Sequence, residues 1–366
     1  MRIGLDGACL SPRPTGVGRY FQGLLRELIP LDPELEYTLF MKGEADPGLR
    51  FPNLRTVTLE GGGSYFIWQN TRLRRALRNG EFDRFWSPNY SLPLCLSTPS
   101  ILTVHDISWR SLPGDYSWAQ RWYKNVTAGR GIRRAGIIFT DSDFSRDEIV
   151  RHARVAAGKV KRVHLGIDEK FQRAGDDEIA GFKARHGVPG QRLIGFLGSF
   201  FKRRHVPEMI AAMEIARRRA PDLVLVLVGE NYSVPPALLL SGRPGVLWLE
   251  RIAEPELNAF YSSLSLFLYP SDYEGFGLPP MEALNCGTPS LLLPRGSLAE
   301  VYEGLALFID RPDPALIAEA IAGYLQREEE TRQRLLDRWR ERKPYFSWKR
   351  AAAECLGEIR QAPCPS

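Results

Sequence analysis

The stretch LIGFLGSFFKRRHVPEMIAAMEIARRRAPDLVLVLV, residues 193–228, decides the fold class. It begins with the apolar run Leu193–Leu197, crosses a loop with a glycine and several cations, continues as a helical pattern over Pro207–Arg219 and ends in the apolar run Leu223–Val228. Continuous apolar runs, rather than alternating ones, are typical of parallel strands that helices cover on both faces. The stretch therefore predicts a strand–helix–strand unit of a parallel sheet.

The same alternation of apolar runs and helical patterns extends along the whole chain. The predicted strands are Arg2–Asp6, Tyr37–Met41, Leu54–Leu59, Arg84–Ser87, Ile101–Val104, Gly136–Thr140, Leu193–Leu197, Leu223–Val228, Val246–Leu249, Leu266–Tyr269, Ser290–Leu293 and Leu307–Ile309. The predicted helices are Val17–Ile29, Gln69–Arg78, Trp118–Arg134, Phe144–His152, Pro207–Arg219, Pro255–Ser262, Pro279–Asn285, Pro314–Gln326 and Trp348–Arg360. Two such series predict an α/β protein with two Rossmann-like domains, whose parallel sheets face each other across a cleft.

The chain of 366 residues is too long for one ordinary core and suits two α/β domains. A polar stretch at residues 168–177 separates the two series, so we expect an N-terminal domain over residues 1–170 and a C-terminal domain over residues 171–345. The last predicted helix, within residues 346–366, follows the final strand and is free to pack back on the N-terminal domain.

Composition excludes several classes of protein. Hydrophobic residues make up 44% and charged residues 25%, which are globular proportions, and no run approaches the roughly 18 apolar residues of a membrane-spanning helix. The first strand begins at Arg2, which leaves no room for a signal peptide. The five cysteines are never spaced as CxxC, so we expect reduced thiols, a cytoplasmic protein and no zinc site.

Positive charge gathers in the first half of the chain. Residues 1–175 carry 26 Lys and Arg against 18 Asp and Glu, whereas the remainder carries 23 against 25. The predicted helix Trp118–Arg134 combines five cations with Trp118, Trp122 and Tyr123. That combination suits an anionic membrane surface, and Arg-rich faces that simply stay solvated are the alternative. The sequence has no nucleic-acid motif, and we expect no nucleic-acid partner.

Two loops carry groups suited to a diphosphate. Gly16 and Gly18 lie between the first strand and a helix, where glycines admit a ligand and the helix start attracts anions. Arg203 and Arg204 follow the strand Leu193–Leu197, at the end where open α/β sheets bind ligands, and guanidinium groups match phosphate oxygens. A plain tight turn and a solvated basic loop are the competing interpretations.

Two carboxylates, Glu274 and Glu282, stand eight residues apart in YEGFGLPPME, residues 273–282. The prolines place Glu282 about one turn into a helix and leave Glu274 on the preceding loop. One carboxylate is suited to sugar hydroxyls and the other to a ribose diol. The backbone between them is suited to a diphosphate and is formed by Gly275, Phe276, Gly277 and Leu278. Two unrelated surface glutamates are the alternative, against which the GFGLP run argues.

His105 ends a predicted strand of the first domain, within the segment VHD at residues 104–106. An imidazole at this strand end can donate to a sugar hydroxyl or to a leaving group. A single histidine at the end of a strand is more often structural. The functional interpretation of His105 therefore depends on the other candidate sites in the chain.

Taken in chain order, these segments resemble glycosyltransferase family 4. The segments are Asp6-Gly7, TGVGRY at 15–20, VHD at 104–106, SDFSR at 142–146, Gly166-Ile167-Asp168, GSFFKRR at 198–204, EGFGLPPMEA at 274–283, SLAEV at 297–301 and FSW at 346–348. The resemblance spans nearly the whole chain, and two glutamates in E-x7-E spacing around GFGLP are specific. TGVGRY further resembles the branch with O-antigen mannosyltransferases.

The resemblance implies a GT-B fold, retention of anomeric configuration, no cofactor and no metal. It implies a nucleotide diphosphate sugar as donor, with GDP-mannose favoured and a UDP-hexose as the alternative. The acceptor would be a glycan or a lipid-linked hydroxyl, at the inner face of the membrane or in the cytoplasm. The implied catalytic residues are His105, Arg203, Arg204 and Glu274. In the implied donor site, Glu282 holds the ribose and Ile252 lies near the base.

The sequence departs from the family pattern in ways that bear on the donor. Arg204 replaces the usual Lys, and Glu250 stands where many members have Gly. The segment Asp141-Ser142-Asp143 has the DxD spacing with which other glycosyltransferases hold a metal. It ends a predicted strand and opens a helix, so Ser142 or Asp143 is predicted to be an N-cap, and no metal is expected.

Other functions fit the same pattern less well. A sugar-nucleotide epimerase or hydrolase would bind the same donor without an acceptor. A non-catalytic partner subunit would keep the fold, but the intact arginine pair and both glutamates argue against it. A nicotinamide dehydrogenase is disfavoured because the first turn lacks GxGxxG.

Overall fold

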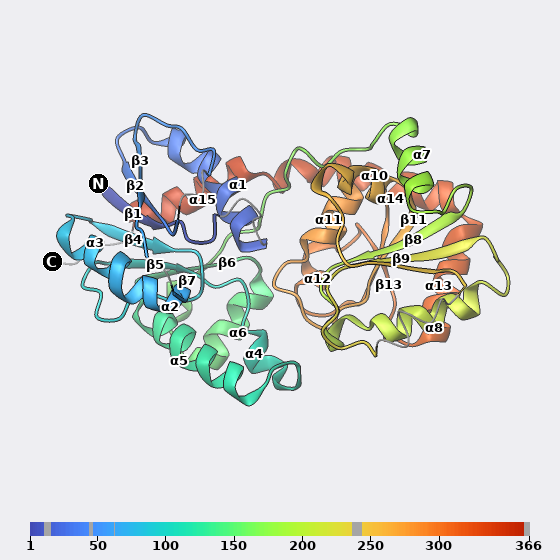
Figure 1. Ribbon diagram of the computed structural model, residues 1–366, viewed down its shortest axis with the longest axis horizontal. Helices are drawn as coiled ribbons and strands as arrows, with labels where there is room; N and C mark the ends of the chain where they lie inside the picture. The colour runs from blue at the N-terminus through green and yellow to red at the C-terminus, as the bar shows by residue number, and fades with distance from the viewer. Residues whose placement is uncertain (11–15, 44–46, 62, 236–243, 362–366) are drawn as a thin grey trace. The chain divides into compact units, whose positions relative to one another are not determined.

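A computed structural model describes most of the chain (Figure 1). The described residues are 1–10, 16–43, 47–61, 63–235 and 244–361. Thr15 of the TGVGRY segment and Cys364 lie outside them. The four cysteines within them are free thiols.

The chain forms two compact units. Unit 1 consists of Met1–Gly166 and Tyr345–Ser366, and unit 2 consists of Ile167–Pro344. The chain thus leaves unit 1 after Gly166 and returns at Tyr345, whereas these limits were expected after residues 170 and 345.

Unit 1 is built on a seven-stranded parallel sheet with the order β3-β2-β1-β4-β5-β6-β7. Its strands are β1 (Arg2–Asp6), β2 (Glu36–Met41), β3 (Leu54–Thr58), β4 (Arg84–Ser87), β5 (Ser100–Thr103), β6 (Ile137–Thr140) and β7 (Val160–Arg162). Its main helices are α1 (Gly16–Leu31), α2 (Tyr65–Trp68), α3 (Arg74–Asn79), α4 (Ser108–Ser111), α5 (Trp118–Arg134), α6 (Asp143–Ala153) and α15 (Trp348–Gln361). All residues of β4, β5 and β6 are buried, as expected for central parallel strands.

Unit 2 is built on a six-stranded parallel sheet with the order β10-β9-β8-β11-β12-β13. Its strands are β8 (Arg192–Leu197), β9 (Leu223–Val228), β10 (Val246–Leu249), β11 (Leu264–Tyr269), β12 (Ser290–Leu292) and β13 (Leu307–Phe308). Its main helices are α7 (Asp176–Arg185), α8 (Val206–Ala216), α10 (Leu257–Ser262), α11 (Leu278–Asn285), α12 (Ser297–Val301), α13 (Pro314–Gln326) and α14 (Glu328–Arg342). The predicted strand–helix–strand unit of residues 193–228 is confirmed as β8, α8 and β9.

Each sheet contains one point at which the strand order reverses. In unit 1, successive strands are added on one side of β1 as far as β3, and from β4 onward they are added on its other side. In unit 2 the reversal falls in the same way between β8 and β11. At such a switch point the connections leave the sheet on opposite sides, which opens a crevice at the carboxyl ends of the two strands. The two switch points therefore set where ligands are expected.

The short helices α2, α4 and α12 were not predicted, and neither were three further elements whose sequences lack an apolar signal. Strand β7 is only three residues long and reads VKR. Helix α14 reads EEETRQRLLDRWRER, and only Leu335 and Trp339 are buried in it. Helix α7 begins inside the polar stretch that was expected to be a linker. A helix with so narrow an apolar stripe shows little periodicity.

Trp348 fixes both the C-terminal helix and the end of unit 1. Helix α15 packs along α1, and the first turn of α15 carries Trp348. A Cβ atom on Gly166 would lie 2.3 Å from the backbone nitrogen of Trp348, and one on Gly23 of α1 would lie 2.6 Å from the Trp348 ring. Both positions therefore need glycine for close approach rather than for backbone conformation.

We predict that Gly166→Ala destabilises unit 1. The added methyl group meets backbone atoms that cannot move aside, so the free energy of unfolding should fall by about 1–3 kcal/mol, measured as a lower midpoint in urea or heat. Gly158→Ala is the matched control, because a Cβ atom there meets nothing within 4 Å. Equal midpoints for the two variants would contradict this role of Trp348.

Candidate functional site

The switch point of unit 2 gathers most of the candidate residues. After β8 the chain passes Gly198 and forms a short 3-10 turn, Lys202–Arg204, which leads into α8. After β11 it forms the loop of Ser271 to Gly277, which leads into α11. Because parallel strands end at the same edge of a sheet, the turn and the loop lie beside each other.

Arg204 and Glu274 join these two segments. Nε of Arg204 lies 2.9 Å from one carboxylate oxygen of Glu274, and Nη2 lies 3.3 Å from the other. Their side chains are 12% and 11% exposed. The Glu274 carboxylate also accepts from Ser271 at 2.9 Å, and Arg204 donates to the carbonyl of Ser199 at 3.0 Å. Two candidate residues are thus partners in one bidentate, nearly buried ion pair.

The charges around Glu274 keep it ionised. Burial alone would raise the pKa of its carboxyl group, but the positive charges of Arg204 and Arg203 outweigh burial and hold the pKa below its ordinary value. Glu274 is therefore a carboxylate at neutral pH, able to accept hydrogen bonds or to act as a nucleophile.

Arg203 is held at the same place by its backbone and its side chain. Its carbonyl accepts from the amide of Asp272 at 2.9 Å, which fastens the turn after β8 to the loop after β11. Its guanidinium lies 4.6 Å from the centre of the Phe201 ring, a typical cation–π contact. His205 follows in the left-handed conformation (φ 52°) and binds Asp272 at 2.7 Å. The arginine pair is thus part of a rigid turn.

Glu282 lies on α11, whose start confirms the predicted position of the prolines. The helix begins after Gly277, which has a φ of 88° that favours glycine. Glu282 is buried, and it accepts a hydrogen bond from Tyr261 at 2.7 Å. Sequence reasoning missed Tyr261, because its partnership with Glu282 joins residues 21 positions apart. Ile252, in the segment after β10, is half-buried.

The other candidates belong to unit 1. Gly16 and Gly18 open helix α1, which follows β1. At the switch point, Asp6 ends β1 and is buried, and it accepts from the Tyr65 hydroxyl at 2.6 Å and from the Ala8 amide at 3.1 Å.

His105 pairs with Asp141, the first residue of the DxD segment, for which no partner was predicted. Nδ1 of His105 lies 2.8 Å from a carboxylate oxygen of Asp141, and both residues are buried. The register of β5 and β6 explains this contact, because Thr103 pairs with Phe139, and two residues further along each chain stand His105 and Asp141. The predicted N-cap is confirmed for Ser142, which accepts from the Ser145 amide.

Asp141 sets the protonation of His105. Burial alone would lower the pKa of the imidazole, but the charge and hydrogen bond of Asp141 outweigh burial and raise that pKa above its ordinary value. The carboxylate also fixes the ring orientation by accepting from Nδ1. Nε2 is buried and makes no side-chain hydrogen bond among the described residues, and the carbonyl of Pro88 adds to the raised pKa of the ring.

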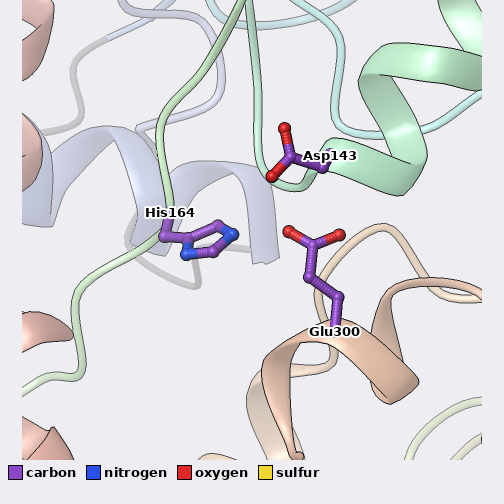
Figure 2. A group of neighbouring side chains, drawn as sticks. All are labelled: Asp143, His164 and Glu300. Carbon is purple, nitrogen blue, oxygen red and sulfur yellow. The ribbon is translucent and has the colours of Figure 1, made fainter.

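Both aspartates of the DxD segment have protein partners in unit 1. Asp141 is engaged by His105, and Asp143 pairs with Arg146 at 2.5 Å and with Arg162 at 3.6 Å. Figure 2 shows Asp143 at the start of α6, His164 on the segment after β7 and Glu300 on α12 of unit 2. Of these three side chains of the metal-binding type, unit 1 by itself supplies Asp143 and His164. Metal independence stays a prediction.

We predict that Asp141→Asn lowers the pKa of His105. The substitution removes the largest influence that raises this pKa and leaves the burial that opposes protonation, with only the weaker contributions of Asp106 and the Pro88 carbonyl against it. NMR titration of the five histidine imidazoles measures the shift. Asp143→Asn is the control, because that carboxylate pairs with Arg146, and it should leave His105 unchanged. An unshifted His105 in Asp141→Asn would contradict the pairing.

Two family models match the chain in succession. The model for glycosyltransferase family 4 matches residues 14–171, and the model for glycosyl transferases group 1 matches residues 180–342. The residues described above at the two switch points lie within or beside these matches.

Curated relatives and solved structures agree with these matches. The chain is 25% identical to O-antigen chain mannosyltransferase B of Escherichia coli over 93% of this chain and 95% of that protein. It is 27% identical to an MMP alpha-(1->4)-mannosyltransferase of Mycolicibacterium hassiacum over 72% of this chain and 66% of that protein. The structure of Anabaena HepE in complex with UDP and glucose has a TM-score of 0.76, with 15% identity, over 98% of this chain and 99% of that chain.

The two parallel α/β units and the structural likeness give the chain the GT-B fold. The matched models and the mannosyltransferase relatives make it an enzyme. The chain belongs to the glycosyltransferases, with a family 4 domain followed by a group 1 domain.

Proposed function

We propose that the protein is a retaining, metal-independent hexosyltransferase that moves mannose from GDP-mannose to a hydroxyl of a glycan or lipid-linked acceptor. The single observation that carries the proposal is the partly buried group of Arg203, Arg204 and Glu274 at the switch point of unit 2. The relatives named as mannosyltransferases favour mannose. HepE, crystallised with UDP and glucose, keeps a UDP-hexose as the alternative donor.

The arginine pair suits the leaving group of such a reaction. Negative charge grows on the nucleoside diphosphate as the sugar bond breaks, and fixed cations near it stabilise the transition state more than the ground state. Two guanidinium groups on a rigid turn provide this charge without a metal. To bind the diphosphate, these guanidinium groups need to rearrange only the hydrogen bonds of the Arg204–Glu274 pair.

The ion pair also couples donor binding to the freedom of Glu274. A diphosphate that takes hydrogen bonds from Arg204 competes with Glu274 for the same donors, so the carboxylate becomes available to the sugar. There it either orients sugar hydroxyls during same-face attack or acts as a nucleophile in a double displacement. The family resemblance favours the first route. His105, held by Asp141, is the proposed donor to a hydroxyl of the transferred sugar.

We predict that Arg203→Ala and Arg204→Ala each lower kcat by at least about tenfold. A buried, charge-assisted contact to phosphate is worth about 1.5–3 kcal/mol, and this contact strengthens in the transition state. The assay measures sugar transfer from GDP-mannose with EDTA present.

Arg192→Ala is the matched control for these variants, because Arg192 pairs with Asp222 at the other end of β8. Thermal unfolding checks that each variant is folded. Near-normal turnover in both variants would refute the proposed role of the arginine pair. Sugar release without transfer to any acceptor would favour the epimerase or hydrolase alternative, and loss of activity in EDTA would overturn metal independence.

We further propose that unit 1 rests on an anionic membrane. Across the described residues, none of the helices is long and apolar enough to cross a bilayer. Helix α5 nevertheless exposes Trp118 (76%) and Trp122 (58%), and Ile67 of α2 is also exposed. The rings of Phe66 and Tyr123 touch, which joins the exposed faces of α2 and α5 into one patch.

Cations lie next to this aromatic patch. Residues 65–79 continue from α2 through a π-helical turn into α3 without a break. Arg74, Arg75 and Arg78 line a hollow of about 380 Å³ on that helix. Tryptophan at the headgroup level combined with arginine is the arrangement expected for binding to anionic lipid.

We predict that the double substitution Trp118→Ser and Trp122→Ser reduces binding to vesicles of phosphatidylglycerol and phosphatidylcholine by several-fold. Flotation measures the bound fraction, which should fall as salt rises. Tyr232→Ser is the control, since Tyr232 is an equally exposed aromatic residue in unit 2. Binding that is equal for neutral and anionic vesicles, or unchanged in the double variant, would show that the patch merely stays solvated.

A further inference from the structure

Lys124 of helix α5 lies inside a ring of aromatic side chains in unit 1. Its Nζ atom is 5.2 Å from the ring centre of Trp109, 5.7 Å from that of Tyr90 and 5.9 Å from that of Tyr116. Lysine and arginine usually extend into water, and three rings around one ammonium group are uncommon. We call these four residues the lysine cage.

The walls of the lysine cage are held in place by their own contacts. The Tyr116 hydroxyl is 2.6 Å from the Ser108 hydroxyl, which in turn binds the Asp106 carboxylate at 2.7 Å. Trp109 donates to the side chain of Asn125 at 3.3 Å, and the rings of Tyr90 and Trp109 meet edge to face. A site whose walls are fixed before a ligand arrives loses little entropy on binding.

Tyr90 adds a strained backbone to the cage. Its φ is 59°, a conformation that non-glycine residues rarely adopt and that tends to occur at functional sites. It follows β4, one of the two switch-point strands of unit 1, and its ring is 5.7 Å from that of His105. The cage therefore adjoins the histidine that we place in the active site.

The charge of Lys124 lacks a counterion. The ammonium group makes no hydrogen bond or ion pair within the part of the chain that the structure describes. Asp106 is the acidic group whose charge acts on the pKa of Lys124, but its carboxylate accepts hydrogen bonds from the amide and hydroxyl of Ser108. Burial lowers the pKa of Lys124, and Asp106 offsets only part of this effect. An anion placed in the cage would relieve this cost.

Lys124 is separate from the proposed membrane patch. Trp118, Trp122 and Val126 are spaced four residues apart and form one exposed stripe of α5. Lys124 is two residues from Trp122, which places it on the opposite face of the helix. The cage thus faces His105 rather than the lipid.

We propose that the lysine cage binds a phosphate group of the acceptor, with Lys124 as its counterion and the aromatic rings against the apolar part of the acceptor. The proposal rests on the proposed function, because it assigns the acceptor to unit 1. A neutral sugar would stack on the rings but would leave the ammonium uncompensated, so a phosphate fits the cage better. The phosphate belongs either to a phosphorylated sugar or to the diphosphate linker of a lipid.

Calorimetric titration with two probes tests the proposal on the whole protein. Citronellyl diphosphate represents a lipid diphosphate and mannose 6-phosphate a phosphorylated sugar, with citronellol as the neutral counterpart. Each titration is run with saturating GDP, which occupies the donor site. Lys124→Met keeps the apolar stem and should weaken at least one phosphate probe by about tenfold or more. Lys124→Arg should restore most of the affinity.

Arg130→Met is the matched control, because it removes a cation from an exposed position of the same helix. If Lys124→Met does not fold, Lys124→Gln takes its place. Loss of affinity for citronellyl diphosphate alone identifies the lipid linker, and equal loss for mannose 6-phosphate identifies the phosphate itself. Wild-type protein that binds neither probe, variants that bind as the wild type does, or citronellol that binds as well as its diphosphate would overturn the proposal.

A failure of the proposed function would look different. Protein that binds no GDP when it is titrated with GDP alone would contradict the donor site in unit 2. The comparison between the wild type and Lys124→Met would still report on the cage, because both proteins share every other phosphate-binding group.

Discussion

The polarity of parallel strands is the constraint on which the rest of this structure depends. Most of the candidate groups stand where a parallel strand ends: Asp6 at the end of β1, His105 after β5, Asp141 after β6, the arginine pair after β8 and Glu274 after β11. Strand direction gathers these ends at one edge of each sheet, and the reversal of strand order opens that edge. Residues far apart in sequence, such as Arg204 and Glu274, therefore meet without any long-range signal between them.

Two buried carboxylate–cation pairs define the chemistry, one in each unit. In unit 2, Arg204 and Glu274 hold each other charged, and in unit 1 Asp141 favours the protonated form of His105. Removing one partner of such a pair leaves an uncompensated charge in a poorly solvated place. A ligand that replaces one partner avoids this cost. We therefore propose that donor binding and the release of Glu274 belong to one exchange of hydrogen bonds.

The sequence predicts the fold well, because continuous apolar runs such as Leu223–Val228 identify buried parallel strands. It also predicts the helix that carries Glu282, since prolines and a glycine mark its start. It failed for Asp141, where a local pattern typical of an N-cap conceals a contact that depends on strand register. Tyr261 and the lysine cage have no motif at all. Their roles follow from packing between helices and loops, which no spacing in the sequence encodes.

The central claim is that the switch point of unit 2 binds the nucleoside diphosphate. Hydrogen exchange with and without GDP or UDP tests it directly, since a bound ligand slows the opening of the backbone that it contacts. The account predicts slower exchange in the segments that follow β8 and β11, at residues 198–205 and 271–278. Slower exchange confined to unit 1, or none at nucleotide concentrations that support sugar transfer, would contradict it.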